Sequence, residues 1–414
     1  MGIAYFTCSV CGSTYFGQEV QYTCPRDGAN LDVHCDFETA ETKPGIESVL
    51  LSPKQSIWRY ASLLPVPDPG FAYTPLHQVG LTPVYQPELL RERLGLKQLW
   101  IKDESRNPSA SFKDRASAVV VARALQTKEE VIIAASTGNA GAALACMAAS
   151  VGMHAIILAP RTAPPAKVAQ LLVFGAQVIL VDGNYDQAFD LSIAASQTFG
   201  WYNRNTGYNP FTAEGKKTAA FEIWEQVLRK LDSAAPPLTI YIPVGDGNII
   251  SGVYKGFQDL LSLGWIERLP RLIGVQAEGS AAIANAYLAG KDTIEPVNAV
   301  TIADSINVDL PRDGLRALRA VRETHGTYIK VSDEEILQAI PILGKVGIFV
   351  EPAAAAAYAG LVRALATGQQ DSAAPVLVLC TGSGLKDINA VMRAIPAAPV
   401  IEPTTESLKK VIYG

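Results

Sequence analysis

The chain has 414 residues, of which 49% are hydrophobic, so it is long enough for two or three domains with a sizeable core. Its net charge of −5 is spread along the sequence without a basic block, which argues against nucleic acid as a partner. No apolar run is long enough to span a membrane, and the first residues lack a signal-peptide pattern. The six cysteines do not resemble a disulfide framework. We therefore expect a cytoplasmic protein without membrane contact.

The first 40 residues contain two short turns with metal-ligand side chains: Cys8, Cys11, Cys24 and Asp27. Twelve residues separate these turns, a spacing typical of zinc ribbons, because each turn presents two ligands to one tetrahedral ion. His34 or Cys35 could replace the carboxylate as the fourth ligand. The equally weighted alternative is a hairpin that has lost its metal. We expect residues 1–40 to form a zinc-ribbon-like extension with a structural role.

After a proline-containing connecting segment at residues 36–70, short apolar strands and helical patterns alternate along the chain. The expected strands are residues 99–102, 131–135, 155–158, 178–181, 239–242, 272–275 and 376–379. The expected helices are residues 139–151, 166–174, 185–198 and 214–230, with another that begins at Pro352. Such alternation predicts an α/β protein with parallel sheets and crossover helices.

Lys113 lies where a polar, proline-containing turn meets the start of an apolar-periodic helix. A lysine at this position can face a cleft beyond the end of the preceding strand. Burial against an apolar wall lowers the pKa of a lysine, which suits the amine to forming an imine. A solvated lysine at a helix start would be the simpler interpretation of this residue alone. Three further turns argue against that interpretation.

These turns follow predicted strands, and open α/β sheets bind ligands beyond the carboxyl ends of their strands. Residues 136–141 expose backbone N–H groups at a helix start, which suits an anion, although a plain N-cap turn has the same pattern. Residues 243–248 contain two glycines and form a phosphate cradle of moderate specificity, but they match no dinucleotide or triphosphate motif. Residues 380–387 add the hydroxyl of Thr381.

The motifs SFKDR (111–115), STGN (136–139), GDGN (245–248) and TGSGLKD (381–387) occur in this order. Together they resemble the threonine synthase branch of the fold-type II pyridoxal-phosphate (PLP) enzymes, the group that includes the tryptophan synthase β-subunit. The resemblance covers almost the whole chain. It implies an α/β fold of two open, mostly parallel sheets wrapped by helices. It also implies a large PLP domain made of residues 41–114 and 205–414, with a small mobile domain at residues 115–204.

The resemblance assigns roles to individual residues. Lys113 would bind pyridoxal 5'-phosphate covalently and, once released, move protons at the substrate Cα. Asn139 would bond the ring oxygen of the cofactor, and Thr381 would face the ring nitrogen, where a hydroxyl moderates the electron sink. The cofactor phosphate would be held by Val244, Gly245, Asp246, Gly247 and Asn248. Substrate contacts would come from Ser136, Thr137, Ala140 and Lys216.

Several positions depart from the family pattern. Ala110 stands where the motif NPTGSFKDR has glycine. In the family, the stretch N-S-x-N-P-x-R-x-E-G-Q uses its serine and arginine to grip a substrate phosphate, and here Gly207 and Thr212 take those places. The nearest cations that could replace the lost contacts are Lys216, Lys217 and Arg204. The run Ala140-Gly141 is closer to the serine and threonine dehydratases.

Three functions remain open on these residues. The first is a threonine synthase that converts O-phosphohomoserine to threonine by γ-elimination and water addition at Cβ. The second is an ammonia-lyase or β-replacement enzyme for an unphosphorylated amino acid. The third is a non-catalytic PLP-binding relative, which the retention of Lys113, Asn139 and Thr381 argues against. We expect the first, as a homodimeric lyase of threonine biosynthesis with a small amino-acid substrate. Glu351 fits a site role and a helix-start acid equally well.

Overall fold

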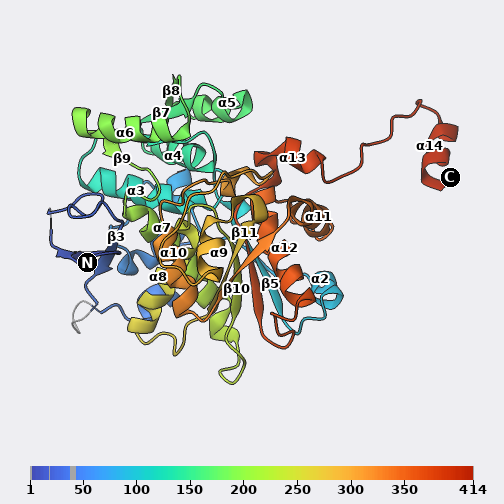
Figure 1. Ribbon diagram of the computed structural model, residues 1–414, viewed down its shortest axis with the longest axis horizontal. Helices are drawn as coiled ribbons and strands as arrows, with labels where there is room; N and C mark the ends of the chain where they lie inside the picture. The colour runs from blue at the N-terminus through green and yellow to red at the C-terminus, as the bar shows by residue number, and fades with distance from the viewer. Residues whose placement is uncertain (1, 18, 38–42, 414) are drawn as a thin grey trace.

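The computed structural model describes residues 2–17, 19–37 and 43–413, and it contains two main sheets wrapped by helices (Figure 1). The larger sheet has six strands in the order β12-β11-β10-β13-β5-β4. Its strands are β4 (Val84–Tyr85), β5 (Leu99–Asp103), β10 (Thr239–Pro243), β11 (Arg271–Ala277), β12 (Thr327–Val331) and β13 (Val376–Cys380). All neighbours pair in parallel except the edge strand β4. The central strands are fully buried, as expected for a parallel sheet with helices on both faces.

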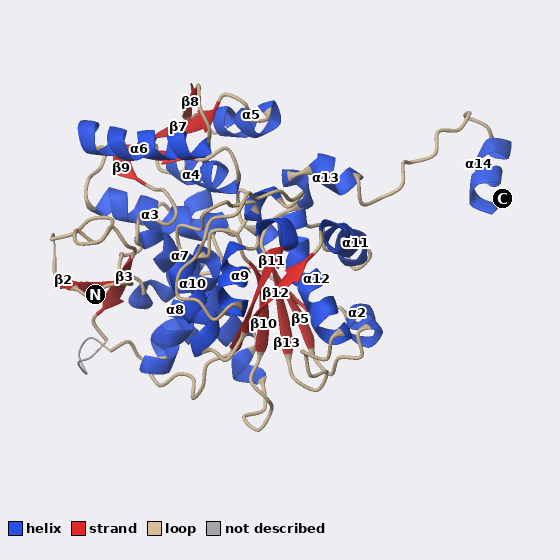
Figure 2. Cartoon of the chain, in the orientation of Figure 1, coloured by secondary structure: helices blue, strands red, loops and turns tan. Residues whose placement is uncertain are grey.

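The smaller sheet has four parallel strands in the order β8-β7-β6-β9. They are β6 (Val131–Ala135), β7 (His154–Pro160), β8 (Gln177–Val181) and β9 (Tyr202–Asn203). The alternation of apolar strands and helices therefore correctly predicted parallel strands, and the family resemblance correctly predicted two mostly parallel sheets. Figure 2 shows the smaller sheet beside α4 (Asn139–Ala149), α5 (Pro165–Val173) and α6 (Tyr185–Phe199), apart from the larger one.

Helices connect the strands in the right places for crossover connections. They are α1 (Glu47–Leu50), α2 (Glu88–Arg93), α3 (Lys113–Gln126), α4 (Asn139–Ala149), α5 (Pro165–Val173), α6 (Tyr185–Phe199) and α7 (Phe211–Gln226). The later ones are α8 (Asn248–Ser262), α9 (Ala282–Leu288), α10 (Gly314–Glu323), α11 (Asp333–Gly344), α12 (Pro352–Ala366), α13 (Ile388–Met392) and α14 (Thr405–Tyr413). The helix predicted from residue 214 begins earlier, and its last residues, Leu228–Lys230, form a separate 3-10 turn.

Four buried charges tie the start of α3 to α7. Arg115 Nη1 lies 2.6 Å from Glu222 Oε1, and Arg115 Nε lies 2.7 Å from Glu104 Oε2. Lys102 Nζ lies 2.8 Å from Glu222 Oε2. All four side chains are fully buried, so their opposite charges must compensate one another. Because Arg115 follows Lys113 by two residues, this cluster fixes the helical turn that carries Lys113.

The N-terminal residues form a separate antiparallel sheet in the order β2-β1-β3. Its strands are β1 (Ile3–Cys8), β2 (Thr14–Tyr15) and β3 (Leu31–Cys35). The end of this extension, expected at residue 40, lies outside the described residues. The hairpin packs on the main body, because the buried side chains of Phe6 and Leu31 belong to the same apolar core as α3 and α4.

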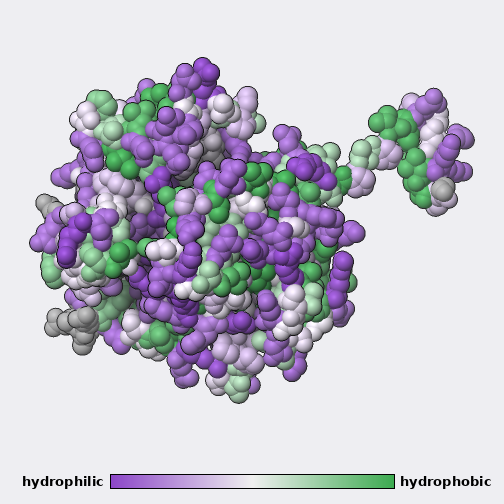
Figure 3. Space-filling view, in the orientation of Figure 1, coloured by the Kyte–Doolittle hydropathy of each residue, from purple (hydrophilic) through white to green (hydrophobic). Residues whose placement is uncertain are grey.

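At the other end of the chain, α14 stands away from the body on an extended segment (Figure 3). It carries exposed apolar side chains at Leu408, Val411, Ile412 and Tyr413. None of the helices in the described residues combines the length and the apolarity needed to cross a lipid bilayer.

Candidate active site

A cavity of about 500 Å³ opens where the turns predicted to carry the chemistry converge. Its wall includes Lys113 after β5, residues 136–140 after β6, residues 243–248 after β10, and Thr381 after β13. The carboxyl ends of parallel strands therefore meet at one opening, as the general rule for open α/β sheets requires. The volume lies within the range of small-molecule and cofactor sites.

Lys113 is the first residue of α3 and is half-buried at the cavity wall. Burial lowers its pKa below the usual range of a lysine, against the opposing effect of the Glu351 carboxylate. A larger fraction of its amine is therefore uncharged near neutral pH. An uncharged amine is the form that attacks a carbonyl carbon, so this environment suits the residue to imine chemistry.

The turn before Lys113 pairs with the turn that carries Thr381. Phe112 N donates to Thr381 O at 2.8 Å, and Ser383 N donates to Ala110 O at 3.1 Å. Ala110 has φ of +63°, a left-handed conformation that favours glycine. Ala110 therefore adopts a conformation that the glycine of the family motif would reach without strain, at a cost of roughly 1 kcal/mol.

Asn139 begins α4, and its amide is held by a carboxylate across the cavity. Its Nδ2 donates to Glu351 Oε1 at 2.9 Å and to Glu351 Oε2 at 3.1 Å. Glu351 is 3% exposed, and burial raises its pKa. At Gly382 an added Cβ would lie 2.4 Å from Glu351 Oε1, so a larger residue there would displace the Glu351 carboxylate. The structure therefore places Glu351 in the site, where the sequence alone left its role open.

The loop Val244–Asn248 presents backbone N–H groups at the start of α8. Within the described part of the chain, the N–H groups of Gly245, Asp246 and Gly247 have no hydrogen-bond partner. Gly247 has φ of +95°, and an added Cβ would lie 2.8 Å from Asp313 O. Unpaired N–H groups at a helix N-terminus form a ready site for a phosphate. Together with Lys113, this donor set fits PLP.

Two neighbouring lysines of α7 have different surroundings. Lys216 lines the cavity and donates from Nζ to Asn248 Oδ1 at 2.5 Å. Burial lowers its pKa well below the usual range, and the nearby charges of Lys113 and Arg204 lower it further. Lys217 instead pairs with Glu214 at 2.6 Å and with Asp259 at 2.8 Å. Of these two lysines, only Lys216 is placed to meet a ligand.

Arg204 is 1% exposed and has two neutral partners. Its Nε donates to Ser117 Oγ at 3.1 Å, and its Nη1 donates to Thr206 Oγ1 at 2.7 Å. Its Nη2 is buried without a partner among the described residues. Burial lowers its pKa to about 10. A buried guanidinium without a carboxylate partner is expected where an anionic ligand completes the charge balance.

The two positions that replace the family's phosphate contacts take no part in the cavity wall. Thr212 is fully buried, and its hydroxyl donates to Asn209 O at 2.8 Å, within its own helical turn. Gly207 has φ of +74°, and an added Cβ would lie 2.6 Å from Arg312 Cβ. A serine at residue 207 would therefore collide with Arg312 in this chain.

One part of the cavity wall was missed by the sequence analysis. The loop at residues 299–312 lines the cavity, and so does the start of α6 at residues 184–186. Arg312 joins the two segments, because its Nη2 donates to Asp186 Oδ1 at 3.0 Å. These segments contain no motif with its own chemistry, so no signal in the sequence could have singled them out.

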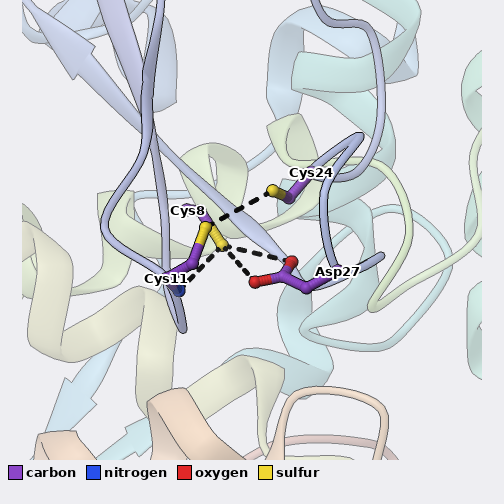
Figure 4. Close-up of side chains that lie close together, drawn as sticks. All are labelled: Cys8, Cys11, Cys24 and Asp27. Carbon is purple, nitrogen blue, oxygen red and sulfur yellow. Dashed lines mark hydrogen bonds between the residues drawn. The ribbon is translucent and has the colours of Figure 1, made fainter.

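Away from the cavity, Figure 4 shows four N-terminal side chains pointing toward one another: Cys8, Cys11, Cys24 and Asp27. Their ligand atoms all lie within 4.8 Å of one another. Cys11 Sγ is 3.7 Å from Cys24 Sγ, and Cys8 Sγ is 3.4 Å from each carboxylate oxygen of Asp27. The ligand atoms of a tetrahedral zinc ion are about 3–4 Å apart, so this donor set fits the ion.

The two residues considered as replacement ligands, His34 and Cys35, lie outside this group. His34 stacks on Tyr5 with ring centroids 4.4 Å apart. Burial raises the pKa of Cys35 to about 11.

Comparison with known proteins identifies the family. Residues 76–382 match the family described as pyridoxal-phosphate dependent enzyme. The chain is 37% identical to a threonine synthase of Methanosarcina acetivorans over 413 residues, which cover 99% of each protein. It is 38% identical over 408 residues to a threonine synthase of Methanocaldococcus jannaschii, with 98% of each covered. The chain belongs to the threonine synthase family of PLP-dependent enzymes.

A solved structure supports the family fold. Threonine deaminase isoform 2 from Solanum lycopersicum aligns with a TM-score of 0.65 and 22% identity, covering 78% of this chain and 86% of that one. At this identity the likeness shows the shared fold alone. Membership in the threonine synthase family confirms the resemblance inferred from the four ordered motifs.

Proposed function

We propose that this chain converts O-phosphohomoserine and water to threonine and phosphate, as a PLP-dependent carbon–oxygen lyase. The observation that carries the proposal is the similarity to threonine synthases over 98–99% of the chain. The cavity supports it, because it places a lysine of lowered pKa beside unpaired backbone donors. When bound, PLP supplies an electron sink that stabilises negative charge on the substrate carbons.

The chain's own residues divide the remaining work. Lys113 would attach the cofactor and then carry protons to and from the substrate carbons. Residues 244–248 would hold the cofactor phosphate, and Asn139, held by Glu351, would meet the ring oxygen. Thr381 would face the ring nitrogen. Ser136, Thr137 and Ala140 line the same cavity and would contact the substrate.

The phosphate of the substrate needs its own donors, because moving a dianion into a closing cavity removes its water. We propose that Arg204 and Lys216 supply them in place of the family's arginine. Both side chains are buried, and the positive charge of Arg204 lowers the pKa of Lys216. The Thr206 hydroxyl, which accepts from Arg204, lines the cavity and connects the guanidinium to it.

The proposed function predicts the outcome of a side-by-side substrate assay. We expect the purified protein to release phosphate from O-phosphohomoserine with formation of threonine, measured by phosphate detection and amino-acid analysis. O-phosphoserine, serine and threonine serve as matched substrates. Ammonia release from serine or threonine, with O-phosphohomoserine inert, would replace the proposal by the dehydratase alternative.

One sequence feature that favoured the dehydratases now has a structural reason. At Gly141 an added Cβ would lie 2.1 Å from Ser136 O, so the start of α4 requires glycine there. The glycine in the run Ala140-Gly141 therefore carries no information about the substrate.

We also propose that the N-terminal hairpin binds one structural zinc ion through Cys8, Cys11, Cys24 and Asp27. We expect elemental analysis of the native protein to find one zinc per chain. Cys24→Ser should remove the metal and lower the melting temperature by roughly 5 °C, because metal binding contributes to folding. Cys35→Ser is the matched control and should retain the zinc. The site would be refuted if the native protein contained no zinc and Cys24→Ser left its stability unchanged.

The organisation of the chain completes the proposal. Residues 115–204 are proposed as a small mobile domain, since the four-stranded sheet runs from Val131 to Asn203. Its closure on the large domain, residues 41–114 and 205–414, would exclude water from the cavity. We propose that the protein is a homodimer. We also propose that it is located in the cytoplasm, in keeping with its six free cysteines.

A further inference from the structure

Asn30 is one of the side chains through which the N-terminal hairpin contacts the start of α10. Its Nδ2 donates to Asp313 Oδ1 at 2.7 Å and to Arg312 O at 3.1 Å. Its backbone belongs to the cysteine turns, because Ser9 N donates to Asn30 O at 2.9 Å and residue 30 bridges to Thr23. Asn30 is therefore held in position by the same turns that carry the four metal-ligand side chains.

Asp313 connects this contact to the loop proposed to hold the cofactor phosphate. It is 2% exposed, and its Oδ2 accepts from Asn248 Nδ2 at 2.7 Å. Its backbone N donates to Asp246 O at 3.1 Å. The preceding residue adds a bond from Arg312 N to Asp246 Oδ1 at 2.6 Å. Asp313 thus fixes the loop at both Asp246 and Asn248.

Arg316 ties the hairpin to Asp313 a second time. Its Nε and Nη2 donate to the two carboxylate oxygens of Asp313 at 2.5 and 3.0 Å. Its Nη1 donates to Leu31 O at 3.2 Å and to Asp32 Oδ1 at 2.9 Å. The hairpin, the start of α10 and the phosphate loop therefore form one continuous network of hydrogen bonds that includes charged groups.

We propose that the N-terminal hairpin holds the cofactor-phosphate loop (Val244–Asn248) in the conformation that binds phosphate. Asn30 is a positioning residue that acts through Asp313, and the metal ion at the four-ligand cluster keeps Asn30 in place. Backbone donors bind a phosphate tightly only when they are already oriented, so a looser loop binds more weakly. The second half of this inference rests on the zinc site proposed above, whereas the first half does not.

The test measures cofactor affinity in the absence of turnover. Apoprotein is titrated with PLP and, separately, with pyridoxal, which lacks the phosphate, and binding is followed by absorbance. We expect Asn30→Ala to raise the dissociation constant of PLP about tenfold, because a hydrogen bond to a charged group is lost. The affinity for pyridoxal should remain unchanged, since the hairpin acts on the phosphate loop alone.

Arg26→Ala is the matched control. Arg26 lies in the same turn as Asp27 and donates only to Ser13 Oγ, at 2.9 Å, among the described residues. The Arg26→Ala protein should bind PLP with the same affinity as the unaltered protein. An Asn30→Ala protein with unaltered PLP affinity would overturn the inference. Equal losses for PLP and pyridoxal would also overturn it, because they would mean general destabilisation.

The role of the metal is tested with Cys24→Ser and with the double variant that combines Asn30→Ala and Cys24→Ser. If the metal acts through Asn30, Cys24→Ser weakens PLP binding and the double variant binds PLP no more weakly than Asn30→Ala. Additive losses would overturn the metal's part and leave that of Asn30 intact. If the native protein proves free of zinc, the zinc proposal fails. The Asn30→Ala titration alone then decides whether the hairpin holds the phosphate loop.

Discussion

Replacing Lys113 by alanine should abolish turnover, with kcat falling by at least about four orders of magnitude. The change removes both the attachment point of the cofactor and the group proposed to carry protons. In the unaltered protein, borohydride should fix the cofactor covalently to Lys113, and mass spectrometry of the digested protein would locate the modified peptide. Phosphate release from O-phosphohomoserine measures the loss of turnover.

The variant should fold normally, because it removes an amine that burial already disfavours in its charged form. Lys128→Ala, at an exposed position two residues beyond the C-terminal end of the same helix, is the matched control and should keep full activity. A Lys113→Ala protein with more than about a tenth of normal activity would show that another group performs the chemistry. That result would contradict the assignment of the site.

Replacing Arg204 by methionine should change activity and stability in opposite directions. We expect kcat/KM for O-phosphohomoserine to fall by about two to three orders of magnitude, because a guanidinium contact to phosphate is lost. We expect the free energy of unfolding to rise by about 1 kcal/mol or more, because a buried charge without a carboxylate partner is removed. Kinetics and thermal unfolding of the same preparation measure both effects.

The two neighbouring lysines provide a matched contrast. Lys216→Met should lower kcat/KM without lowering stability, because Lys216 has no carboxylate partner among the described residues. Lys217→Met should lower the free energy of unfolding by about 3–5 kcal/mol, because Glu214 and Asp259 lose a buried cation. An Arg204→Met protein that is destabilised yet fully active would mean that Arg204 is purely structural.

Strong local patterns explain which parts of the fold could be predicted. The apolar run at residues 131–135 gave a strand with the same ends as β6, and the helix predicted from Pro352 begins there. The strand β12 (Thr327–Val331) was not predicted, because Lys330 limits its longest apolar run to Tyr328-Ile329. Charged side chains at half-buried strand positions conceal the pattern on which strand prediction depends.

The site was predictable where its chemistry is local in sequence. Lys113 and residues 244–248 lie in motifs that could be identified directly. Arg204 was named only as one of three nearby cations, since neither burial nor the lack of a partner is visible in a sequence. The pairing of Asn139 with Glu351 joins residues 212 positions apart, so only the folded chain reveals it.

The position of β13 in the larger sheet has a consequence for synthesis on the ribosome. This strand lies between β10 and β5, yet it is the last strand to be translated. Until residues 376–380 emerge, β5 has no neighbour that links it to β10, and the turn at residues 109–112 lacks its partner at Thr381. The nascent chain therefore exposes unpaired edges of apolar strands for most of its translation, and such edges favour aggregation until β13 emerges.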